Sequence, residues 1–91
     1  MEAKLIKTNG SEVVVQPAKG NSFSLKELQG YVGGFIEFVR IGKKIMVVNE
    51  EGKLDGLECN TVATEIFHKE FPGNADFIVG DVLLTDANLI D

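Results

Sequence analysis

The chain has 91 residues, of which 44% are apolar, and a formal net charge of −5. This length predicts one small domain spanning residues 1–91. The single cysteine, Cys59, excludes an internal disulfide, and the acidic charge makes nucleic acid an unlikely partner, because phosphates repel such a surface.

The N-terminal segment is predicted to form a β-hairpin. Residues 3–8 and 12–16 read as strands, and Asn9-Gly10 lies between them. Both residues tolerate the positive φ of a type I′ turn, so we expect that turn here. Pro17 ends the second strand because it cannot donate to a sheet ladder.

The next element is predicted to be a helix that begins after residue 24. Ser24 and Glu27 have the spacing of a capping box, and Gly33-Gly34 would end the helix. Three apolar residues at helical spacing are expected to line its buried face: Leu25, Leu28 and Val32.

A second hairpin is predicted from residues 35–41 and 44–49, joined by Gly42-Lys43. Both strands are apolar on both faces, so one face needs a cover. The predicted helices or a second copy of the chain could supply it.

Asn60 is expected to cap a second helix over residues 61–70, and residues 76–85 read as a mostly buried strand. The element order is therefore β-β-α-β-β-α-β. We expect an α+β fold, with an antiparallel or mixed sheet and two short helices on one face.

Three segments resemble a family catalogued as domain of unknown function 3846. They are the Gly-Gly-aromatic run at residues 33–37, the Asn-Glu-Glu-Gly-Lys turn at residues 49–53 and the strand at residues 79–85. The resemblance covers about residues 10–86. It implies an accessory role in the cytoplasm of bacteria or in phages and mobile elements. It supplies no substrate, cofactor or catalytic residue.

The turn after residue 48 is the candidate interaction surface. Its spacing does not fit a calcium loop, so an ordinary solvated turn is the competing interpretation. The candidate residues are Asn49, Glu50, Glu51, Lys53, Asp55 and Glu58.

Reactive groups are sparse in this sequence. Asn60 and His68 would lie about 12 Å apart along the second helix, so Cys59, which precedes Asn60, is too far from His68 for a nucleophile and its base. Cys59 is expected to be a small buried or half-buried residue. No zinc ligand set or phosphate loop is present. We therefore expect no catalytic, cofactor-binding or metal-binding residues, no cofactor and no enzymatic activity.

No apolar run approaches the roughly 20 residues of a membrane span, and the N-terminus lacks a signal-peptide core. These features predict a cytoplasmic protein without membrane association.

Three functions remain open at this point. The first is a non-enzymatic accessory domain that binds a protein partner or forms a homodimer. The second is an acidic-surface inhibitor of a DNA-acting enzyme. The third is a small enzyme that uses carboxylates such as Glu37 and Asp81.

Overall fold

The structure is a computed structural model and describes residues 2–90. The element order is the predicted one, followed by a short 3₁₀ turn, η1. The elements are β1 (Ala3–Ile6), β2 (Glu12–Val15), α1 (Leu25–Val32), β3 (Ile36–Ile41), β4 (Lys44–Asn49), α2 (Thr61–Glu70), β5 (Val82–Asp86) and η1 (Ala87–Leu89).

One five-stranded sheet contains all of these strands, in the order β2-β1-β5-β4-β3. Every neighbouring pair is antiparallel, which decides between the antiparallel and mixed sheets that the sequence allowed. β5, the last strand in the chain, lies at the centre and pairs with both hairpins. The two hairpins are therefore joined only when the C-terminal strand is in place.

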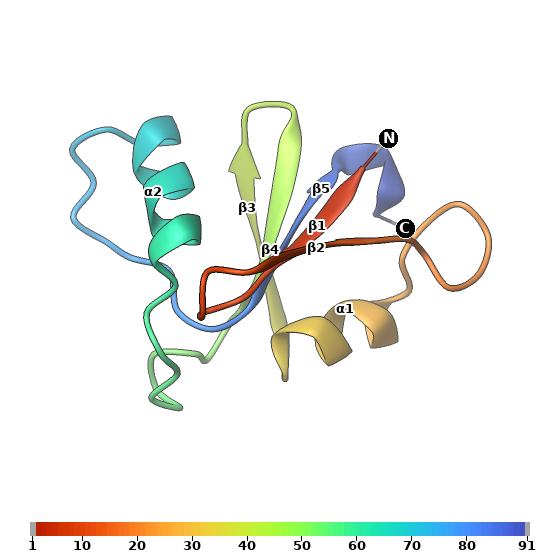
Figure 1. Cartoon of the computed structure of the whole chain (residues 1–91), viewed down its shortest axis with the longest axis horizontal. Helices are drawn as coiled ribbons and strands as arrows, with labels where there is room; N and C mark the ends of the chain where they lie inside the picture. The colour runs from red at the N-terminus through yellow and green to blue at the C-terminus, as the bar shows by residue number, and fades with distance from the viewer. Residues whose placement is uncertain (1, 91) are drawn as a thin grey trace.

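The two helices lie on opposite faces of the sheet, so the expectation that both cover one face is wrong (Figure 1). Neighbouring residues of β4 show this directly. Met46 packs with Phe67 of α2, whereas Val47 packs with Leu28 of α1. Successive side chains of a strand point to opposite faces, so the apolar character of both faces of β4 requires one helix on each side.

The ends of α1 follow from local hydrogen bonding, as predicted. The Ser24 hydroxyl accepts from the backbone N–H of Glu27 at 3.1 Å, and the Glu27 carboxylate accepts from the N–H of Ser24 at 3.0 Å. Gly33 ends the helix in the left-handed conformation, with φ of 81°. Leu25, however, is 59% exposed, because only Leu28 and Val32 turn toward the sheet.

Phe23, which precedes the helix cap, is a principal core residue on the α1 face. It is fully buried and packs with Leu28, which lies four residues after the N-cap residue Ser24. This arrangement is a hydrophobic staple, which fixes the angle at which the chain enters the helix. Its N–H also donates to the Leu89 carbonyl at 2.7 Å, and Leu89 and Ile90 pack against the same cluster.

Asn60 connects the start of α2 to the sheet. Its Oδ1 accepts from the N–H of Ala63 at 3.0 Å, which confirms the predicted cap. Its Nδ2 donates to the carbonyls of Ile6 at 3.0 Å and Gly80 at 2.9 Å, and the side chain is fully buried. One amide thus satisfies groups from three segments that are distant in the sequence.

The last strand begins at Val82, six residues later than predicted. Thr64 of α2 explains part of the difference, because its Oγ1 accepts from the N–H of Ile78 at 3.0 Å. Val79 forms an isolated bridge with Cys59, and Gly80 then turns the chain with φ of 78°. The apolar residues before β5 are therefore held by α2 and its preceding loop rather than by a sheet ladder.

The first hairpin also differs from the expectation. Gly10 has φ of 90°, but Asn9 does not have a positive φ, so the turn is not type I′. The N–H of Gly10 donates to the Lys7 carbonyl at 2.9 Å, and the Asn9 side chain accepts from the N–H of Ser11 at 2.9 Å. The Asn9 side chain thus stabilises the loop without entering the left-handed region.

Candidate interaction surface

Asn49, the first residue of the predicted surface, is a buried structural residue. Its side chain is 8% exposed, and its Nδ2 donates to the Val32 carbonyl at 3.1 Å. Its Oδ1 accepts from the N–H of Glu51 at 2.8 Å. Asn49 therefore connects the end of α1 to the turn after β4, which we call the acidic turn. Both polar atoms of its side chain already form hydrogen bonds within the chain.

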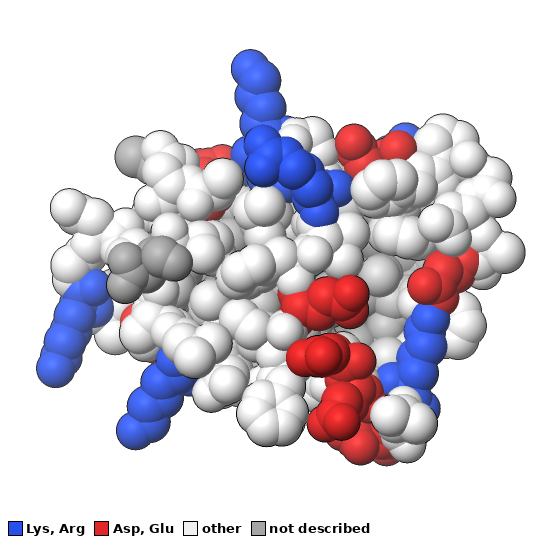
Figure 2. Space-filling model, turned by 180° about the vertical axis from the view of Figure 1, so that it is seen from behind, with Lys and Arg blue, Asp and Glu red and all other residues white. Residues whose placement is uncertain are grey.

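The carboxylates that follow Asn49 are exposed. Glu51 and Asp55 line a shallow pocket of about 250 Å³ together with Phe35. Figure 2 shows a group of acidic side chains in the lower part of one face, with basic side chains at the top, at the lower left and at the right of the same view. Glu58 lines a different pocket, beside Tyr31 and Asp81. The structure thus distributes the predicted residues over more than one pocket.

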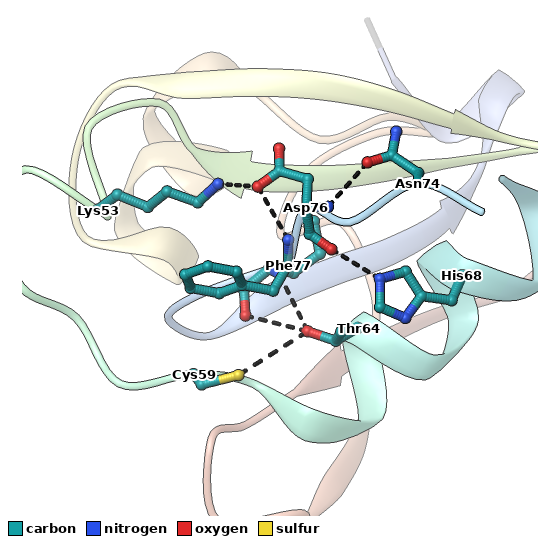
Figure 3. Close-up of polar contacts among 8 residues, drawn as sticks. Lys53, Cys59, Thr64, His68, Asn74, Asp76 and Phe77 are labelled. Carbon is teal, nitrogen blue, oxygen red and sulfur yellow. Dashed lines mark hydrogen bonds and ion pairs between the residues drawn. The ribbon is translucent and has the colours of Figure 1, made fainter. Parts of the chain in front are cut away.

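Lys53 is engaged within the chain. It forms an ion pair with Asp76, and its ammonium lies 4.6 Å from the centre of the Phe77 ring (Figure 3). The hydrogen bond from Lys53, followed by that from the N–H of Phe77, lowers the pKa of the Asp76 carboxyl from its ordinary 3.8. This contact ties the acidic turn to the segment that precedes β5.

Replacement of Lys53 by methionine should therefore raise the pKa of Asp76 toward 3.8. Because the folded pKa is lowered, the contact contributes above the unfolded pKa, and its contribution is lost as the pH falls through the folded value. An NMR titration of the carboxyl carbon measures this change. Lys69→Met is the control, and an unchanged Asp76 titration in Lys53→Met would contradict the assigned cause.

Cys59 and His68 have separate partners, as Figure 3 shows. The Cys59 sulfur lies 4.0 Å from the Thr64 hydroxyl, whereas His68 Nε2 lies 2.6 Å from the Asp76 carbonyl oxygen. Cys59 is exposed, so the expectation of a buried or half-buried thiol is wrong. It directly precedes Asn60, the buried cap of α2.

The carboxylates proposed for catalysis do not share a pocket. Glu37 lines a pocket of about 260 Å³ beside Glu50 and Asp76. Asp81 lines another pocket and accepts from the N–H of Thr8 at 3.0 Å. Within residues 2–90, no group of three or more His, Cys, Asp or Glu side chains is placed to hold a metal ion.

Several exposed apolar residues lie near one sheet edge, and none of them was predicted from the sequence to form a surface. Phe35 and Phe38 are 65% and 50% exposed, and Leu25 of α1 is 59% exposed. Leu25 and Phe38 line a groove of about 310 Å³ with Phe23, Leu28, Ile36 and Ile90. We call Phe35, Ile36, Phe38 and Arg40 the β3 edge surface. The sequence predicts a strand that includes these residues, but it does not reveal the strand order that places β3 at the edge of the sheet.

Among residues 2–90, no helix has the length and apolar character needed to span a bilayer. A family model described as "Domain of unknown function (DUF3846)" matches residues 1–89, so the chain belongs to this family. No curated protein and no solved structure matches the chain at a significant level. Family membership agrees with the resemblance seen in the sequence, and the match extends over nearly the whole chain.

Proposed function

We propose that this member of the DUF3846 family is a non-enzymatic protein-interaction domain of a bacterial or mobile-element system, and that it acts through the β3 edge surface. The exposure of Phe35 and Phe38 carries the proposal. Aromatic residues are favoured at protein interfaces, and each of these two rings exposes a large apolar area to water. The groove beside Phe38 extends this apolar surface toward α1.

The placement of the reactive groups supports a binding role. Cys59 and His68 contact different partners, and Glu37 and Asp81 line different pockets. A general base must reach the group that it activates, within hydrogen-bond distance or through one water. The arrangement therefore favours recognition over covalent chemistry.

A photo-crosslinking amino acid at position 35 tests the proposal. Phe35 lies outside the strand ladder and is exposed, so p-benzoylphenylalanine should be accommodated there. In cells of the native host, irradiation should give a discrete covalent adduct with a protein. The matched control is position 14, because Val14 is 57% exposed on β2, at the opposite edge of the sheet. Absence of an adduct at position 35, or equal labelling at both positions, would contradict the proposal.

The gathered acidic side chains favour a second candidate, an inhibitor of a DNA-acting enzyme. Glu50, Glu51 and Asp55 are exposed in the turn after β4, and a basic DNA-binding surface would be attracted to them. Reversal of these charges together with that of Glu58 should abolish binding to such an enzyme. Binding that survives the fourfold reversal would exclude this candidate.

A further inference from the structure

Among residues 2–90, no strand pairs with the backbone of β3 on the side away from β4. The Phe35 carbonyl accepts from the N–H of Glu50 at 2.8 Å, so the backbone of residue 35 points toward β4. Backbone groups alternate in direction along an antiparallel strand. The N–H and C=O groups of Ile36, Phe38 and Arg40 therefore point outward, and β3 is the last strand of the sheet among the described residues.

The two edges of the sheet differ in their protection. β2 has four residues, and Pro17 lies two residues after its end. The Glu12 carboxylate of β2 forms an ion pair with Lys4 Nζ of β1 at 3.8 Å. β3 has six residues, and its register with β4 is continuous from Ile36 to Ile41, without a bulge. A long, regular edge without proline is a template for pairing with another strand. Of the two sheet edges, the β3 edge is thus the more suitable for pairing with an additional strand.

We propose that the occupant of this edge is β3 of a second copy of the chain, in an antiparallel pairing with Val39 on the twofold axis. A twofold axis perpendicular to the sheet makes the two β3 strands antiparallel. It also leaves the α1 faces of both copies on the same side of the joined sheet. Phe38 then lies opposite Arg40 of the second copy, and Glu37 lies opposite Ile41. The outward backbone groups of residues 38 and 40 form the ladder between the copies.

Complementarity between Phe38 and Arg40 selects this register. Phe38 is half exposed, and Arg40 forms no ion pair among residues 2–90. The pairing places each guanidinium beside an aromatic ring of the other copy, where a cation–π contact can form. An axis at Glu37 or at Arg40 would oppose like charges directly. An axis at Phe38 would place Arg40 opposite Ile36, without this contact.

The inference rests on the proposed function and specifies its partner. Sedimentation equilibrium of the purified full chain tests it. The weight-average mass should rise with concentration from the 9.9 kDa monomer toward twice that value. Phe38→Lys opposes two like charges across the axis and should raise the dimer dissociation constant at least about tenfold. Phe38→Glu opposes a carboxylate to each Arg40 and should retain the dimer.

The pair of charged variants separates this register from non-specific apolar association, in which both charges would disrupt the dimer equally. Val14→Lys at the opposite edge is the control and should not change the mass. A wild-type monomer at concentrations up to about 1 mM would overturn the inference, as would equal loss in both variants. A persistent cross-link from position 35 to a different protein would then leave the proposed function intact. A monomer without any cross-link would remove both.

Discussion

Replacement of Asn60 by alanine should lower the free energy of unfolding by about 3–4 kcal/mol. The helix cap accounts for about 1 kcal/mol of this loss. The remainder arises because the carbonyls of Ile6 and Gly80 lose a buried hydrogen-bond donor. Urea denaturation followed by circular dichroism measures this change in the free energy of unfolding. The comparison requires that the wild type and the variant have the same slope of unfolding free energy against urea concentration.

Asn60→Asp separates the two contributions, because aspartate retains the acceptor for Ala63 and loses the donor to the two carbonyls. It should therefore lose most of the same stability. Asn74→Ala is the matched control, since Asn74 is exposed and, among residues 2–90, its side chain accepts only from the N–H of Asp76. Its expected cost is below about 1 kcal/mol. Equal effects at positions 60 and 74 would show that Asn60 does not connect the helix to the sheet.

Phe23→Ala should destabilise the fold by about 3–5 kcal/mol, the range for removal of a buried aromatic side chain. The ring is fully buried and meets Tyr31 edge-on, with 6.0 Å between the ring centres. Its loss would leave a cavity between α1 and the C-terminal turn and would remove the staple with Leu28. Chemical denaturation gives the size of the effect.

Phe77→Ala is the control for this prediction. Phe77 is 44% exposed, and its ring contacts the Lys53 ammonium at the surface. It should cost less than about 1 kcal/mol, because little apolar area returns to water. If Phe23→Ala had no larger effect than Phe77→Ala, the α1 face would not depend on the segment before the helix.

The helix boundaries could be predicted because their signals are local. Ser24 with Glu27, Gly33 and Asn60 each act within a few residues of the element that they begin or end. The turn at Gly42-Lys43 is equally local, and the structure closes β3 and β4 with Ile41 opposite Lys44. In each case the residues carrying the signal satisfy backbone groups close to them in the chain.

The placement of the helices could not be predicted so directly, although a signal was present. Ile45 and Val47 alternate with Met46 and Val48 along β4, so both faces of this strand are apolar. That pattern requires a cover on each side, whereas assigning both helices to one face left the other open. The late start of β5 depended on Thr64, which is distant in sequence from Ile78.

The candidate site was harder to predict, because its character depends on contacts between distant residues. Asn49 is buried and donates a hydrogen bond to the Val32 carbonyl, and Lys53 forms an ion pair with Asp76. Nothing near either residue in the sequence reveals these partners. The exposure of Phe35 and Phe38 likewise follows from strand order, which is set by the pairing of β5 with β1 and β4.

Amide hydrogen exchange along β3, measured by NMR as a function of protein concentration, tests the central claim most directly. The N–H groups of Phe38 and Arg40 point outward, whereas that of Val39 points toward β4 and serves as an internal reference. The account predicts that Phe38 and Arg40 exchange rapidly in dilute solution and become protected as the concentration rises, while Val39 is protected throughout. Rapid exchange at Phe38 and Arg40 at every concentration would contradict it.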